Sequence, residues 1–209
     1  MKVVIVGASA AGLSCLDALQ RFSLARTVTL ISEEPYPPYC RCLLTHRLAG
    51  DVTPEQMTLW EPSREGPELS LLLGRRVLSL EVRSREALLD DGRRIPYDRL
   101  LLATGAEPIK PGYCDEGKNI FTLRYLADLA KIESALGPKA LVIGGGLVGI
   151  KAALALKERG VAVEMLISSS YPLSQVLDRE TGETIGRGYS GYSGGYSGDI
   201  IPFIIDIPP

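Results

Sequence analysis

The sequence predicts a doubly wound α/β fold, because two glycine-rich loops each lie between a short apolar strand and a helix. Both loops, residues 7–12 and 144–149, match the pattern G-x-[GS]-x-x-G, and their first glycines are 137 residues apart (144 minus 7). At such a junction, backbone N–H groups and the positive end of the helix dipole can hold a pyrophosphate. Glycine is required because a side chain would block the turn, the phosphate or the helix–strand contact. Two such loops predict two bound dinucleotides with electrons passing between them.

The composition fits a globular cytoplasmic protein. The 209 residues, 45% of them hydrophobic, suffice for one core or two modest domains. Lysine and arginine number 23 against 25 acidic residues, which argues against nucleic acid as a partner. Four cysteines form no secreted disulfide framework, and the chain enters a strand within two residues, which leaves no room for a signal peptide. The most apolar stretch, 140–156, contains four glycines and Lys151, so no membrane span is expected.

The first unit is predicted in the order strand, helix, strand. Residues 3–6 form an apolar run typical of a strand buried on both faces of a parallel sheet. A helix with one apolar face follows, marked by Leu13, Leu16, Leu19 and Phe22. Residues 27–32 form the second strand, and Glu33 follows it, 26 residues beyond Gly7 (33 minus 7). An acid at this position can accept a hydrogen bond from a ribose hydroxyl; the alternative is a solvated acid pair, Glu33-Glu34, in a loop.

Strands also dominate the region between the first unit and the second loop. Residues 69–74 and 77–89 predict strands, and Asp91-Gly92 predicts a hairpin turn. We therefore expect a β-hairpin insertion at about 69–95. Residues 94–103 then form a strand that ends in the sequence Ala-Thr-Gly-Ala at 103–106.

The order of these motifs resembles one known family. The chain carries GxSxxG at 7–12, Pro-Pro-Tyr-Cys-Arg at 37–41, Tyr-Asp at 97–98 before Ala-Thr-Gly-Ala, and GGGxxG at 144–149. From Met1 to about Asp178 it resembles the pyridine nucleotide-disulfide oxidoreductases, FAD-dependent enzymes of the nitrite reductase, rubredoxin reductase and NADH oxidase type. The resemblance implies two Rossmann-like domains, truncated. They are an FAD-binding part at 1–112 and a partial NAD(P)-binding βαβ unit at 113–178, followed by a low-complexity linker and apolar tail at 179–209.

The family implies roles for matching residues. Around FAD it places the loop and the residues near the ribose, adenine and flavin, namely Gly7, Ser9, Ala11, Gly12, Glu33, Arg41, Val77, Ala103, Thr104 and Gly105. At the pyrophosphate of NAD(P)H it places Gly144, Gly146 and Gly149. Hydride then passes from nicotinamide to flavin, and the protein supplies position and electrostatics.

The end of the second unit's strand and Lys151 depart from the family pattern, and His46 has an open role. The second unit's strand at 161–167 ends in three serines, 168–170, where relatives that use NADH carry a glutamate and users of NADPH often carry arginine. The choice between NADH and NADPH therefore stays open. Lys151 stands in the place of a glutamate. His46 aligns with a lysine that some relatives hold near the flavin; the alternative is an ordinary packed histidine.

The cysteines carry one catalytic hypothesis. Cys42 aligns with a redox cysteine of some relatives, and Arg41 could provide the electropositive setting that a reactive thiolate needs. The alternative is that Cys40 and Cys42 are small, half-buried residues beside the flavin, because Cys-x-Cys is not the Cys-x4-Cys redox motif. No metal site is expected. Cys15 and Cys114 are expected to be inert, and Trp60 to pack rather than to shield the flavin.

The C-terminal part changes character after residue 185. Three Tyr-Ser-Gly triplets between 189 and 198 are typical of a flexible linker. The ending at 199–209 is apolar but interrupted by prolines, so at best it predicts an edge strand. The relatives' later Gly-Asp segment is absent, which predicts weak FAD binding by this chain and self-association through an open sheet edge or the tail.

The function expected from the sequence is an FAD-dependent NAD(P)H oxidoreductase, or a fragment of one. The alternative is a non-catalytic nucleotide-binding or interaction module that keeps the fold without turnover. The electron acceptor stays open between a nitrite reductase centre, rubredoxin, oxygen and a disulfide.

Overall fold

The computed structural model describes residues 1–59, 67–108, 119–187, 192–194 and 204–206. The chain forms two compact units. The first contains Met1–Cys40 and Glu55–Ala106, and the second contains Arg41–Pro54 and Glu107–Pro209. No helix in the part of the chain that the structure describes is long and apolar enough to cross a membrane.

The first unit is built on a four-stranded parallel sheet with the order β3-β2-β1-β7. Its strands are β1 (Lys2–Val6), β2 (Thr27–Ser32), β3 (Glu68–Leu73) and β7 (Arg99–Leu102). The central strand β1 is buried along most of its length, which explains its run of apolar residues. The predicted α/β fold with parallel strands is confirmed.

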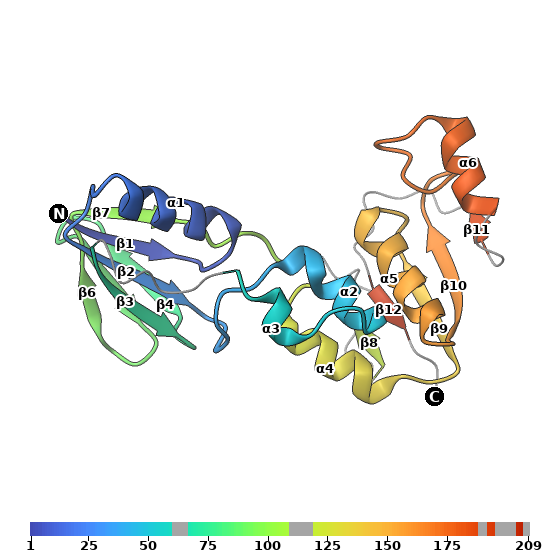
Figure 1. Cartoon of the computed structure of the whole chain (residues 1–209), viewed down its shortest axis with the longest axis horizontal. Coiled ribbons are helices and arrows are strands. Elements are labelled where there is room, and N and C mark those ends of the chain that lie inside the picture. Colours follow the sequence, from blue (N-terminus) through green and yellow to red (C-terminus); the bar gives the residue numbers. More distant parts are fainter. Residues whose placement is uncertain (60–66, 109–118, 188–191, 195–203, 207–209) are drawn as a thin grey trace. The chain divides into compact units, whose positions relative to one another are not determined.

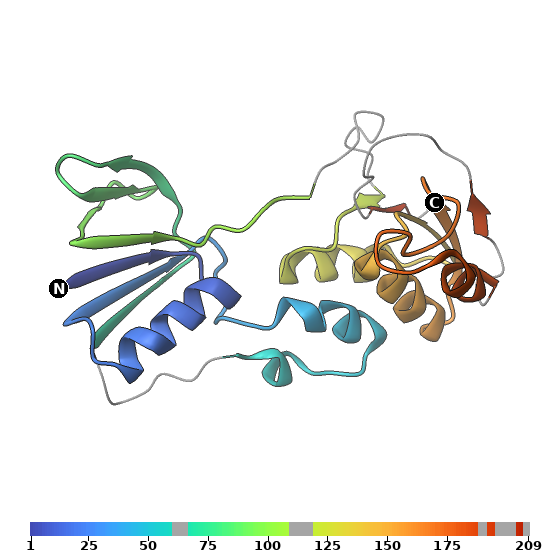
Figure 2. The ribbon, with the colours of Figure 1, turned by 90° about the horizontal axis from the view of Figure 1, so that it is seen from above.

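Opposite faces of this sheet carry different layers (Figures 1 and 2). Helix α1 (Ala10–Arg21) covers one face, where Leu16 and Leu19 pack against Val3, Ile5, Val28 and Leu30. A three-stranded antiparallel meander covers the other face, made of β4 (Val77–Glu81), β5 (Glu86–Leu89) and β6 (Arg94–Pro96). There Leu89 packs against Val4, Val6 and Ile31. Alternate side chains of β1 therefore pack into two separate hydrophobic cores, one under α1 and one under the meander.

Two expectations for this unit were wrong in part. Residues 68–73 do not belong to a hairpin insertion, because β3 pairs in parallel with β2 from Thr27–Glu68 to Ser32–Leu73. The meander begins only at Val77, although its predicted turn at Asp91-Gly92 is present. Phe22 lies beyond the last turn of α1 and is 65% exposed, so it does not extend the buried helix face.

The second unit contains a five-stranded sheet with the order β11-β10-β9-β12-β8. Its strands are β8 (Ile120–Phe121), β9 (Lys139–Ile143), β10 (Ala162–Ile167), β11 (Tyr192–Gly194) and β12 (Ile204–Asp206). Strand β10 pairs in parallel with β9 and β11, whereas β12 runs antiparallel to both β9 and β8.

The position of β12 corrects the prediction for the tail. Instead of an edge strand, the described tail residues form an interior strand that closes one side of β9. The prolines at 202, 208 and 209 fall outside the three paired residues, so every paired residue keeps its backbone N–H. The sequence analysis expected an open edge in this sheet, and on this side of β9 the chain itself covers it.

The second unit also contains helices. They are the short turn η1 (Arg41–Leu43), α2 (Leu44–Ala49), α4 (Leu126–Ala135), α5 (Leu147–Glu158) and α6 (Arg179–Arg187), with α3 (Pro54–Met57) at the boundary of the units. Helix α2 packs against α5 and α4, with Leu44 and Leu48 buried. Three alanines of α5 (152, 153 and 155) are buried, and their small side chains permit close helix contacts.

Candidate functional site

The first glycine loop lies where the carboxyl ends of three parallel strands meet. The Gly7 N–H donates to the Ile31 carbonyl of β2, and the Ala103 N–H, just after β7, donates to the Val6 carbonyl of β1, both at 2.8 Å. Open α/β sheets bind ligands at this edge. Gly7 has a φ of +113°, a conformation that favours glycine.

Two glycines of this loop have no room for a side chain. A Cβ on Gly7 would lie 2.1 Å from the Ala103 carbonyl oxygen, and a Cβ on Gly12 would lie 1.9 Å from the Gly7 carbonyl oxygen. Both obstacles are backbone atoms, so no rotamer change relieves them. The N–H groups in the first turn of a helix have no intrahelical partner. The loop thus offers backbone donors at the positive end of a helix dipole.

The two other predicted loop residues frame the start of α1. Ser9 precedes the helix with extended backbone (φ −118°, ψ −164°), and its carbonyl accepts the first helical hydrogen bond, from the Leu13 N–H at 2.9 Å. Ala11 lies exposed in the first turn. A small residue here leaves the surface in front of the first-turn N–H groups uncovered.

Glu33 follows β2 directly and is 68% exposed. One carboxylate oxygen lies 3.7 Å from the guanidinium of Arg76, itself 65% exposed. An exposed pair of this kind is weak, so the carboxylate can accept hydrogen bonds from a ligand hydroxyl. Glu34 differs from Glu33, because its carboxylate accepts a hydrogen bond from the Tyr39 hydroxyl (2.5 Å). Glu33 and Glu34 are therefore not equivalent, because Glu33 is exposed beside Arg76 whereas the Glu34 carboxylate is bound by the Tyr39 hydroxyl.

The remaining predicted residues of the first unit lie at strand ends. Val77 begins β4 and its side chain packs against the cluster of Val4, Val6, Ile31 and Leu89, so only its backbone is suited to a ligand. Thr104 and Gly105 follow β7 and are exposed, and Gly105 has a φ of +72°. The chain therefore leaves the sheet here through a turn that favours glycine.

Arg41 belongs to the second unit, where it contacts residues before α4. Its Nη1 donates to the Arg124 carbonyl (2.9 Å), and its guanidinium lies over the Tyr125 ring, 4.9 Å from the centroid. The Tyr125 hydroxyl donates to Glu107. Burial and this bond raise the pKa of Tyr125 to about 12, so the hydroxyl stays protonated at neutral pH. The Asp128 carboxylate accepts the backbone N–H groups of Arg124 and Tyr125, each at 2.9 Å.

Arg124 is a candidate that the sequence analysis missed. Its Nε is buried and has no hydrogen-bond partner among the described residues. A buried guanidinium nitrogen without an acceptor is costly, so an unpaired one indicates a place for an anionic group. Nothing in the sequence distinguished it from a solvated arginine.

The second glycine loop repeats the geometry of the first. Gly144 has a φ of +118° and its N–H donates to the Leu166 carbonyl of β10 at 2.8 Å. Gly146 precedes α5, its carbonyl accepts the Ile150 N–H (3.0 Å), and Gly149 is buried in the first turn. A Cβ on Gly145 would lie 2.8 Å from Cγ2 and 3.1 Å from Cβ of the buried Ile167 side chain. The obstacle at Gly145 is therefore a side chain, whereas at Gly7 and Gly12 it is backbone.

The segment after β10 folds back onto this loop. The Leu173 N–H donates to the Gly145 carbonyl (2.8 Å), and Leu173 adopts a φ of +57°. The Ser169 hydroxyl donates to the Tyr171 carbonyl (2.7 Å). Residues 168–170 thus bring no charge to the strand end, and Lys151, on α5, is the single charged residue in the stretch 144–156.

The described cysteines differ in solvent exposure. Cys42 lies in η1 and is exposed, which contradicts the half-buried alternative for this residue, whereas Cys40 and Cys15 are half-buried. The Cys40 N–H donates to the Met57 carbonyl at 2.8 Å. Trp60 and Cys114 lie outside the described residues. Within the ranges that the structure describes, no group of three or more histidine, cysteine or acidic residues could hold a metal ion.

The sequence of the chain is similar to those of a known protein family and of several characterised proteins. The sequence profile of the pyridine nucleotide-disulphide oxidoreductases matches residues 1–188. The chain is 28% identical over 192 residues to the ferredoxin–NAD(+) reductase component of the p-cumate 2,3-dioxygenase system of Pseudomonas putida, covering 90% of this chain and 48% of that protein. It is 31% identical over 186 residues to the NADH-rubredoxin oxidoreductase of Clostridium acetobutylicum, covering 87% and 48%.

A solved structure of a reductase also resembles this chain in fold. The crystal structure of a covalent putidaredoxin reductase–putidaredoxin complex superimposes with a TM-score of 0.85 at 26% identity, covering 93% of this chain and 49% of that one. The chain thus spans about half the length of these relatives.

Proposed function

This chain belongs to the pyridine nucleotide-disulphide oxidoreductase family, and on that premise we propose that it binds FAD at the first glycine loop and NAD(P)H at the second. The proposed activity is an NAD(P)H oxidoreductase that passes hydride to FAD and then electrons to an acceptor. One observation carries the proposal most directly: a Cβ at Gly7 or Gly12 would collide with backbone at 2.1 or 1.9 Å. A cradle this tight keeps backbone N–H groups available to a pyrophosphate.

The proposed FAD contacts follow from the strand ends of the first unit. The N–H groups around Ser9, Ala11 and Gly12 receive the pyrophosphate, and the Glu33 carboxylate accepts hydroxyls of the adenosine ribose. The backbone of Val77 faces the adenine, and the turn at 103–105 passes the flavin half. Arg41 keeps its proposed role toward FAD.

Arg124 joins Arg41 as a proposed anion ligand. The two residues contact each other through the Arg41 guanidinium and the Arg124 carbonyl. The unpaired buried Nε of Arg124 would gain an acceptor from a phosphate oxygen.

The second loop is the proposed NAD(P)H site, with Gly144, Gly146 and Gly149 at the pyrophosphate. The end of β10 carries Ser168 instead of a carboxylate or guanidinium. Hydroxyl groups discriminate poorly between a ribose hydroxyl and a ribose phosphate, so we propose that the chain accepts both NADH and NADPH. Hydride chemistry belongs to the bound cofactors. The protein's own share is to bind and orient their phosphates, and its electron acceptor is proposed by class only, as a small redox protein or molecule.

The proposal is tested by flavin capture and bleaching. The purified full chain is incubated with FAD and passed through gel filtration, and the flavin-to-chain ratio is read from absorbance. We expect flavin to co-elute with the wild type and not with Gly12→Val. Anaerobic addition of NADH or NADPH then bleaches the flavin. Absence of flavin from the wild type would overturn the proposal, whereas bound flavin without bleaching would favour the non-catalytic module.

A further inference from the structure

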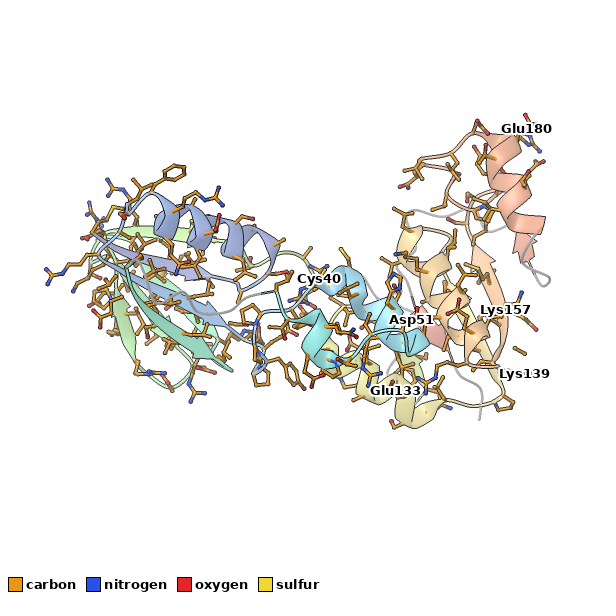
Figure 3. All side chains as sticks on the ribbon, viewed as in Figure 1. Cys40, Asp51, Glu133, Lys139, Lys157 and Glu180 are labelled. Carbon is orange, nitrogen blue, oxygen red and sulfur yellow. The ribbon has the colours of Figure 1, made fainter. Side chains whose placement is uncertain are left out.

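The one histidine of the chain lies in a hydrogen-bonded relay of three side chains. His46, on α2, has Nδ1 3.4 Å from Oδ2 of Asp51, in the turn after that helix. Its Nε2 lies 3.3 Å from Nζ of Lys151, on α5. All three residues belong to the second unit, and Asp51 is labelled in Figure 3 next to the end of α2. Both ring nitrogens therefore have a polar partner.

The chemistry of the two partners decides the proton position on the ring. A lysine ammonium group only donates hydrogen bonds, so Nε2 must accept and carry no proton. A carboxylate only accepts, so Nδ1 must hold the proton and donate it. The relay is thus satisfied by one form of His46, the neutral Nδ1–H tautomer. Protonation of Nε2 would set a second N–H against the Lys151 ammonium group.

The helices that pack against α2 hold this arrangement in place. Nη1 of Arg159, at the end of α5, donates to the Leu48 carbonyl (3.3 Å) and contacts Glu133 of α4 at 3.1 Å. Arg47, next to His46, lies 3.7 Å from the same Glu133 carboxylate. The other charged groups on α4 and α5 are Asp128, Lys131, Lys157 and Glu158. Among the described residues, Asp51 and Lys151 are the charged groups whose side chains lie within hydrogen-bonding distance of the imidazole.

We propose that His46 is a positioning residue: hydrogen-bonded between Asp51 and Lys151 as the Nδ1–H tautomer, it fixes the Lys151 ammonium group on the helix of the second glycine loop. Lys151 lies two residues after Gly149 and is the single charge in the stretch 144–156. Tied to His46, its ammonium group is directed toward α2.

The single histidine makes the relay directly measurable. In the uniformly nitrogen-15-labelled full chain at pH 8, the two imidazole nitrogens are assigned from their chemical shifts. We expect Nδ1 to be protonated and Nε2 to be unprotonated. Lys151→Met removes the ammonium group while keeping most of the stem, and should lower the Nδ1–H to Nε2–H ratio about fivefold, the factor of one net hydrogen bond. Lys157→Met is the matched control on the same helix (Lys157 is labelled in Figure 3) and should leave the ratio unchanged.

Two results would overturn the relay: a predominantly Nε2–H imidazole in the wild type, or equal tautomer ratios in the wild type and Lys151→Met.

Discussion

The substitution Gly12→Ala adds a single methyl group at the tightest point of the first loop. The new Cβ would lie 1.9 Å from the Gly7 carbonyl oxygen, while such contacts essentially never fall below 3.0 Å. Helix α1 or the loop must therefore move by about 1.1 Å (3.0 minus 1.9). Overpacking costs about 1–3 kcal/mol, and because the obstacle at Gly12 is backbone we expect the upper part of that range, about 2–3 kcal/mol. The better helix propensity of alanine returns about 1 kcal/mol, so we expect a net loss of ~1–2 kcal/mol.

Hydrogen exchange with mass spectrometry measures this loss locally. Peptides covering β1 and α1 should exchange about 5- to 30-fold faster in Gly12→Ala than in the wild type, the factor equivalent to that free energy. Two matched variants at the second loop should show smaller losses of stability than Gly12→Ala. Gly145→Ala meets the Ile167 side chain at 2.8 Å, a milder overlap than 1.9 Å at Gly12, and should cost less, and Gly146→Ala meets nothing within 4 Å and should cost least. The same proteins are then tested for flavin capture, which Gly12→Ala alone should abolish.

Equal exchange in Gly12→Ala and Gly146→Ala would refute the reasoning, because it would show that the backbone contact at Gly12 is not a constraint. Retention of wild-type flavin capture by Gly12→Ala would refute the proposed role of the loop even if the stability change were found.

Three further predictions concern other parts of the chain. Cys42→Ser should keep flavin capture but lose turnover with disulfide or peroxide acceptors, measured by NADH consumption, whereas Cys40→Ser should change this turnover little. Equal turnover in the wild type and Cys42→Ser would show that Cys42 is not a redox thiol. Arg124→Met should not lower the melting temperature, because the buried Nε has no hydrogen-bond partner among the described residues to lose; a lower melting temperature would contradict an unpaired Nε. Hydrogen bonds from Arg93 lower the pKa of Asp91, so the ionised carboxylate stabilises the fold fully above the ordinary carboxyl pKa of about 4 and loses this effect as the pH falls further. Asp91→Asn should therefore lower the melting temperature at pH 7, and the difference in melting temperature between wild type and variant should be smaller at pH 3. An equal difference at both pH values would contradict this reasoning.

The sequence was most informative where a local pattern determines a local structure. The apolar strand, the glycine loop and the following helix were predictable because each glycine is required by the turn or by the helix contact, and the second loop repeats the pattern. Strand β2 was predicted with its observed bounds. The acid after it was predictable because its position depends only on where that strand ends.

Other features depend on contacts between distant parts of the chain. The sequence of 68–73 reads as a strand, but whether it joins a hairpin or the parallel sheet is decided by its partner β2. Phe22 continues the helical spacing, yet the helix ends one residue earlier. Arg124 became a candidate only when its Nε was found buried without a partner. No sequence pattern indicated that His46 and Lys151, 105 positions apart, would meet.

The interior position of β12 has a consequence for synthesis of the chain. Strand β9 ends at Ile143, and its partner in β12 begins at Ile204, 61 residues later (204 minus 143). At a translation rate of about 5–20 residues per second, one side of β9 waits roughly 3–12 s for its partner to be made. During that interval the nascent chain presents an unpaired strand edge, to which another nascent chain or a chaperone can bind. The order in which the ribosome delivers the strands, and not only their final pairing, therefore governs how safely this sheet is completed.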